Sequence, residues 1–153
     1  MWGLRSDRRG FDVSTPQPRS RARAWVLQLL YACEMSDGGS LTEYASTALT
    51  RRRAAPRYRP YIDRLLTVLE AHRQEIDKTL QDHIANWRLD RLAAIDRNIL
   101  RLGVAELRYV EEIPGKVAIT EALKLAERYG SDDSAAFVNG VLDSVYRDAA
   151  VAG

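Results

Sequence analysis

Cysteine and histidine are scarce in this 153-residue chain, which has one Cys and two His. A single cysteine, Cys33, cannot form a disulfide within the chain, so we expect a fold that needs no oxidising compartment and a cytoplasmic location. His72 and His83 would lie about 16 Å apart on a continuous helix, whereas metal–ligand bonds measure about 2 Å. We therefore do not expect the two histidines to share a metal, and we predict no metal or other cofactor.

Long apolar runs are also missing, since no stretch approaches the roughly 18 apolar residues that a membrane span requires. The pair Arg8-Arg9 resembles part of an export signal, but it leads into Asp12, Pro16 and Pro18 rather than into an apolar segment. We expect no membrane partner. No segment alternates polar and apolar residues over the length of a strand, which indicates an all-α fold.

No group of residues predicts catalysis. Cys33 falls on the apolar stripe of a predicted helix, where a thiol is far more often structural than nucleophilic. Gly38-Gly39 is not followed by the Lys and Ser or Thr of a phosphate-binding loop. Paired acids such as Asp132-Asp133 fall in loops or at helix starts, where capping and solvation explain them. The chain is therefore not expected to be an enzyme.

The 23 basic and 21 acidic residues are unevenly distributed. The first 24 residues hold six Arg and two Asp, and the remainder holds 17 basic and 19 acidic side chains. A basic arm on a mildly acidic body indicates a polyanionic partner such as a nucleic acid. The alternative is that the arginines only solvate a tail, because residues 1–18 show no apolar period and are predicted to be disordered.

Beyond this tail, apolar residues recur with the helical period, and we expect about seven helices. The first carries an apolar stripe from Ala22 to Cys33. Ser40 and Glu43 match a capping box at the start of the second helix. Pro56 separates the second from a third, and a fourth follows a break near residue 72.

Three further helices are expected in the second half of the chain. Segment 89–110 has apolar residues on two sides, so we predict that it is a central helix. The next begins at Pro114-Gly115 and ends at Gly130 as its C′ residue. Ser131 or Asp132 is expected to cap the last helix.

Arginines and one aromatic residue are the candidates for binding. Arg19, Arg21 and Arg23 fall at the start of the first predicted helix, where guanidinium groups can form paired hydrogen bonds with phosphate. Acidic residues would suit the helix dipole better at this position, so the arginines favour a binding role. Phe137 falls beside the centre of an apolar stripe, and it is either a core residue or a partly exposed platform for base stacking.

Two segments carry a resemblance to a known family. Residues 113–143 include Ile113-Pro114, Lys116-Val117-Ala118-Ile119 and Phe137-Val138-Asn139-Gly140-Val141-Leu142-Asp143. They are similar to the C-terminal signature of the NusB transcription antitermination family, and residues 19–34 resemble its arginine-rich first helix. The resemblance implies an all-helical RNA-binding domain over residues 19–150, in which two small helical bundles share a long central helix.

The resemblance also implies a function. NusB proteins are non-catalytic RNA-binding factors that, with the ribosomal protein NusE, bind boxA, a single-stranded element of nascent ribosomal RNA, and support processive transcription by RNA polymerase. Matching positions imply RNA contacts by Arg19, Arg21, Arg23, Lys116, Asp133 and Phe137. They imply NusE contacts by Tyr31 and Asp96. The basic run is thinned here to Arg-Ser-Arg-Ala-Arg, so we expect the isolated chain to bind RNA weakly.

Two other functions are open at this point. RNA cytosine-methyltransferases carry a similar helical domain, although the chain ends at Gly153 without a methyltransferase domain. A protein-binding or dimerisation module is the other, and in it the arginines would bind a partner rather than RNA. A homodimer is also possible whatever the function, because an apolar stripe does not distinguish a contact within a subunit from one between subunits.

Overall fold

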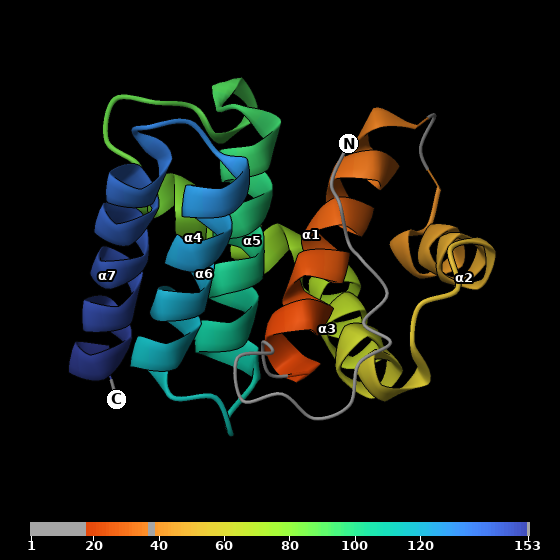
Figure 1. Cartoon of the computed structure of the whole chain (residues 1–153). Helices are drawn as coiled ribbons and strands as arrows, with labels where there is room; N and C mark the ends of the chain where they lie inside the picture. The colour runs from red at the N-terminus through yellow and green to blue at the C-terminus, as the bar shows by residue number, and fades with distance from the viewer. Residues whose placement is uncertain (1–17, 37–38, 153) are drawn as a thin grey trace. The chain divides into compact units, whose positions relative to one another are not determined.

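The computed structural model describes residues 18–36 and 39–152. Within these ranges the chain forms seven α-helices and two short 3-10 helices and has no strand (Figure 1). The all-α prediction and the expected number of helices are therefore confirmed. The chain divides into two compact units, unit 1 (Met1–Glu70) and unit 2 (Ala71–Gly153). Of the predicted disordered tail, only Pro18 is described, and it is the first residue of the first helix.

Unit 1 contains α1 (Pro18–Met35), α2 (Leu41–Arg51), the 3-10 helix η1 (Pro56–Tyr58) and α3 (Arg59–Ala71), whose last residue crosses the boundary. Helix α1 packs against α2 and η1. The predicted stripe of α1 is buried as far as Leu30, but Cys33 at its end is only half-buried. The core of this unit consists of aliphatic side chains, among them Val26, Leu29, Leu49, Ile62, Leu65 and Leu69.

The start of α2 is capped in part as predicted. Ser40 Oγ accepts a hydrogen bond from the Glu43 N–H at 3.4 Å. The carboxylate that completes the cap belongs to Glu70 of α3, not to Glu43: it accepts from Ser40 Oγ at 2.6 Å and from Thr42 Oγ1 at 2.7 Å. These hydrogen bonds, led by that from Ser40, lower the pKa of Glu70. The anion at the positive end of α2 therefore fastens that helix to α3.

Unit 2 contains α4 (Arg73–His83), the 3-10 helix η2 (Leu89–Arg91), α5 (Ala94–Tyr109), α6 (Gly115–Tyr129) and α7 (Ser134–Ala152). Helix α5 packs against α4, α6 and α7. Every residue from Arg97 to Glu106 is buried, which confirms a central helix in this unit. The predicted break near residue 72 is also confirmed, since His72 separates α3 from α4.

The predicted helix over 89–110 is wrong at its beginning. Leu92 and Ala93 are extended between η2 and α5. Side chains pair with backbone groups on both sides of this break: Gln81 Oε1 accepts from the Leu89 N–H at 2.9 Å, and Arg97 Nη1 donates to the Leu92 carbonyl at 2.7 Å. Helix α5 therefore starts five residues later than the apolar pattern indicates.

Two glycines in unit 2 allow close approach of neighbouring groups. A Cβ on Gly103 of α5 would lie 2.6 Å from Leu142 Cδ1, so the glycine lets α7 pack closely on α5. Gly130 ends α6 as predicted, but its φ of −89° is not the left-handed value usual for a C′ glycine. A Cβ there would collide with the Ser134 side chain. Gly130 is therefore required by the tight turn into α7, not by its backbone angles.

Candidate nucleic-acid interface

The three arginines of α1 have different surroundings. Arg19 is exposed and Arg21 is half-buried, whereas Arg23 is buried, with 3% of its surface exposed. The guanidinium carbons of Arg19 and Arg23 each lie 5.5 Å from the centre of the Tyr61 ring in α3. Residues four apart share a helix face, so one aromatic ring serves both cations.

Arg21 points to another side of α1. Its Nε is buried and has no hydrogen-bond partner within the part of the chain that the structure describes. The first turn of α1 contains no acidic residue that could neutralise the arginines locally. Arg21 as a residue is only half-buried, so part of its side chain remains accessible.

The second group of candidates lies at the turn between α6 and α7. The buried Ser134 hydroxyl donates to Asp96 Oδ1 at 2.6 Å and accepts from the Ser131 N–H at 2.9 Å. Because Asp96 is in the first turn of α5, this hydroxyl ties the turn to α5 at one end of unit 2 (Figure 1). Asp96, expected to contact a partner, thus also has a structural hydrogen bond that the sequence did not indicate.

Asp133 and Phe137 are presented by the same turn. Helix α7 begins at Ser134, so Asp133 occupies the position before the helix that was predicted for Ser131 or Asp132. Asp133 is exposed, and Phe137, in the first turn, is half-buried. Phe137 is therefore neither a fully buried core residue nor a fully exposed platform, and one part of its ring surface is accessible.

Lys116 is not close to this turn. It is exposed in the first turn of α6, whereas the turn follows the last residue of that helix. Thirteen residues of α-helix span about 20 Å. Lys116 therefore lies at the opposite end of α6 from Asp133 and Phe137 (Figure 1). Tyr31, the other predicted partner residue, is half-buried in α1 of unit 1.

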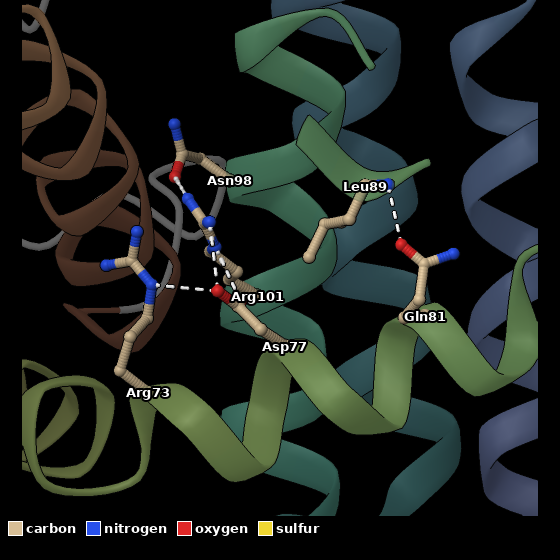
Figure 2. A network of polar contacts seen from close by, with 6 residues as sticks. All are labelled: Arg73, Asp77, Gln81, Leu89, Asn98 and Arg101. Carbon is tan, nitrogen blue, oxygen red and sulfur yellow. Dashed lines mark hydrogen bonds and ion pairs between the residues drawn. The ribbon is translucent and has the colours of Figure 1, made fainter. Parts of the chain in front are cut away.

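The sequence reading missed a network of charged side chains between α4 and α5. Arg101 donates to Asp77 through Nε at 2.8 Å and Nη2 at 3.1 Å, and through Nη1 to Asn98 at 3.2 Å (Figure 2). Arg73 Nε approaches the same carboxylate at 3.3 Å. The available signal was that Asn98 and Arg101 are polar residues one turn apart on a helix predicted to be buried on two sides.

One further glycine has no structural explanation within its unit. Gly140 is exposed in the middle of α7, and a Cβ added there would meet no atom within 4 Å. Packing against another helix therefore does not account for this glycine.

Neither a metal site nor a membrane helix is found in the part of the chain that the structure describes. Among residues 18–36 and 39–152, no three His, Cys, Asp or Glu side chains are grouped so that they could hold a metal ion. No helix in these ranges combines the length and the apolar character that crossing a membrane requires.

Comparison with known proteins identifies the family. The family model described as NusB family matches residues 20–147. The chain belongs to the NusB family. Among curated relatives, the transcription antitermination protein NusB of Myxococcus xanthus is 42% identical over 130 residues, which cover 83% of this chain and 93% of the relative. NusB of Bacillus subtilis is 37% identical over 130 residues, covering 85% and 95%.

Solved structures of the family share the fold. NusB of T. maritima superposes with a TM-score of 0.78 at 30% identity, covering 88% of this chain and 94% of that one. A chain in the crystal structure of antitermination factors NusB and NusE in complex with dsRNA gives a TM-score of 0.77 at 27% identity, covering 88% and 99%. The resemblance stated from residues 19–34 and 113–143 is therefore confirmed.

Proposed function

We propose that this NusB-family chain is a non-catalytic transcription antitermination factor that binds boxA RNA together with NusE. The observation that carries the proposal is the set of arginines at the start of α1, of which Arg19 is exposed and Arg21 is half-buried. Relatives named transcription antitermination protein NusB and a similar chain solved with NusE and dsRNA support it. They do not favour the methyltransferase alternative.

The arginines of α1 would supply electrostatic capture. Guanidinium groups bind phosphate oxygens in pairs of hydrogen bonds, and the helix N-terminus adds its own positive potential. Arg19 and Arg21 are accessible for this role, whereas the burial of Arg23 favours support from within unit 1. Each phosphate contact to a single strand releases counterions, so affinity should fall with salt by about 0.7 log units per contact.

Unit 2 would supply the contacts that depend on bases. The accessible part of the Phe137 ring offers a stacking surface worth about 1–3 kcal/mol per base. The exposed carboxylate of Asp133, one turn earlier, can accept hydrogen bonds from base amino groups. Lys116, at the other end of α6, would contact a phosphate separately from these two residues.

NusE and RNA polymerase complete the proposed assembly. We assign NusE contacts to Asp96, which is half-exposed at the start of α5, and to Tyr31 of α1. A homodimer would compete with these contacts if it used the same residues. The polymerase would then encounter RNA that is already held by the protein pair, which accounts for an effect on transcription without any catalytic group in this chain.

Fluorescence anisotropy of a labelled boxA RNA tests the proposal. We expect selective binding over a scrambled RNA of equal length, tighter binding with NusE, and a log–log salt slope of about −2 for three phosphate contacts. Arg21→Gln should weaken binding and reduce the slope by about 0.7. Lys78→Gln removes the same charge from an exposed ion pair on α4 and should change neither.

Equal affinity for both RNAs with a flat salt response would overturn the RNA-binding proposal. The protein-binding alternative makes the opposite prediction: Arg19→Gln and Arg21→Gln would weaken capture of NusE in a pull-down and leave RNA retention unchanged. Measuring both partners with the same variants therefore separates the two functions.

A further inference from the structure

We propose that Tyr61 is a positioning residue of the RNA-binding surface. Its ring orients the Arg19 guanidinium for contact with a phosphate, and the buried Arg23 contacts the same ring. The inference rests on the proposed RNA-binding function. Tyr61 is not among the residues proposed above to contact RNA. The three residues come from α1 and α3, both in unit 1.

The geometry makes one ring common to two cations. Both guanidinium carbons lie 5.5 Å from the ring centre of Tyr61, within the distance of about 6 Å at which a cation is attracted to an aromatic face. Tyr61 is half-buried on α3, between an exposed surface and a core to which Ile62 and Leu65 of the same helix contribute. A contact with its ring restricts the rotamers of a long side chain that would otherwise lose freedom on binding.

The two arginines cannot have the same role. Arg23 is 3% exposed, so its guanidinium cannot reach a phosphate without leaving the interior of unit 1. Arg19 is exposed, and no carboxylate in residues 18–36 or 39–152 forms an ion pair with it. Arg19 is therefore the member of the pair that is available to a ligand.

The arrangement also favours an anion at this place. Like charges four residues apart on a helix repel each other by a few tenths of a kcal/mol, and the ring offsets part of this repulsion. A phosphate beside the exposed Arg19 would reduce the repulsion further.

A cycle of substitutions at Tyr61 and Arg19 tests the inference, with anisotropy of labelled boxA RNA as the readout. Tyr61→Met keeps an apolar side chain and removes the ring; we expect affinity to fall about two- to fivefold with an unchanged salt slope. Tyr61→Phe should restore it. In the Arg19→Gln background, Tyr61→Met should have no further effect, because the residue that it positions is gone.

Tyr44→Met is the matched control, since Tyr44 is a half-buried tyrosine of α2 in the same unit. It should leave RNA affinity unchanged while lowering thermal stability to a similar extent. Wild-type affinity in Tyr61→Met, or an equal loss in the Arg19→Gln background, would overturn the inference. Failure of the unsubstituted protein to bind RNA would instead overturn the proposed function, and this inference with it.

A second measurement, by NMR, tests the contact between Arg19 and Tyr61 without removing the aromatic ring. In the unsubstituted protein, the NMR signal of the Arg19 Nε–H should be displaced upfield by the ring current of Tyr61 and should move when RNA is added. Tyr61→Phe should keep the displacement. A signal at the position of a free arginine in both proteins would overturn the inference even if Tyr61→Met failed to fold.

Discussion

Substitution of Asp77 tests how the charged network of Figure 2 supports unit 2. Its carboxylate accepts two hydrogen bonds from Arg101, at 2.8 Å and 3.1 Å. The Arg101 side chain is 7% exposed and that of Asp77 is 31% exposed. Asp77→Ala would therefore remove this carboxylate from a guanidinium that is buried between α4 and α5 and also donates to Asn98.

The expected loss follows from these exposures. Removing one partner of a buried ion pair costs about 3–5 kcal/mol. Water can reach the Asp77 side of the pair and rehydrate part of Arg101, so we expect a lower value, about 2–3 kcal/mol. Urea unfolding followed by circular dichroism should show a lower midpoint with an unchanged slope, because the surface exposed on unfolding is nearly the same.

Arg73→Gln is the matched control, because Arg73 shares the same acceptor. Its Nε lies 3.3 Å from Asp77, but its side chain is 43% exposed and the pair is four residues apart on α4. Such surface pairs contribute about 0.3–0.5 kcal/mol. Equal losses for Arg73→Gln and Asp77→Ala, or a loss below about 0.5 kcal/mol for Asp77→Ala, would refute the reasoning from burial.

Three further outcomes are expected. The pKa of Glu70 is lowered from 4.5 by its hydrogen bonds, so its ionised form stabilises the fold above that value; the stability difference between wild type and Glu70→Gln in urea should be largest near neutral pH and vanish as pH falls through the lowered pKa. Gly140→Ala should raise stability by about 1 kcal/mol, because the helix gains and the new Cβ meets nothing within 4 Å; a lower melting temperature would contradict this. Gly115→Ala should lower the free energy of unfolding in urea by about 1–3 kcal/mol, because the added Cβ would collide with the Tyr146 ring. An unchanged free energy of unfolding would show that α6 and α7 can move apart at no cost.

Local pattern predicted the elements and most of the core. The apolar stripe of the last helix, Val138, Val141, Leu142 and Val145, is buried throughout. The pattern succeeds because apolar residues recur every three or four positions along the buried face of an amphipathic helix. In α6 the pattern is less accurate, because the helical period from Ile119 includes Leu123, which is half-buried, and omits Leu125, which is buried. Helix α6 contacts both α5 and α7, and two neighbours widen the buried face.

The apolar pattern could not predict hydrogen bonds between residues that are far apart in the sequence. Ser40 with Glu70, Asp77 with Arg101 and Ser134 with Asp96 join residues 30, 24 and 38 positions apart. Each partner alone has an ordinary local explanation, as a cap or a solvated charge. Only the packing of helices brings the pairs together, which is why a residue predicted for partner binding, Asp96, also proves to hold the turn that presents Asp133.

The arginines of α1 show how burial changes a prediction based on residue type. The sequence makes Arg19, Arg21 and Arg23 candidates alike for RNA binding, but Ala22 to Leu27 are all buried, so Arg23 belongs to the interior of unit 1. Two arginines rather than three are then available to phosphate, and α1 should contribute about −1.4 rather than −2.1 to the salt slope. If α1 binds RNA as proposed, burial leaves Arg19 and Arg21 to contact phosphate and gives Arg23 a supporting position inside unit 1.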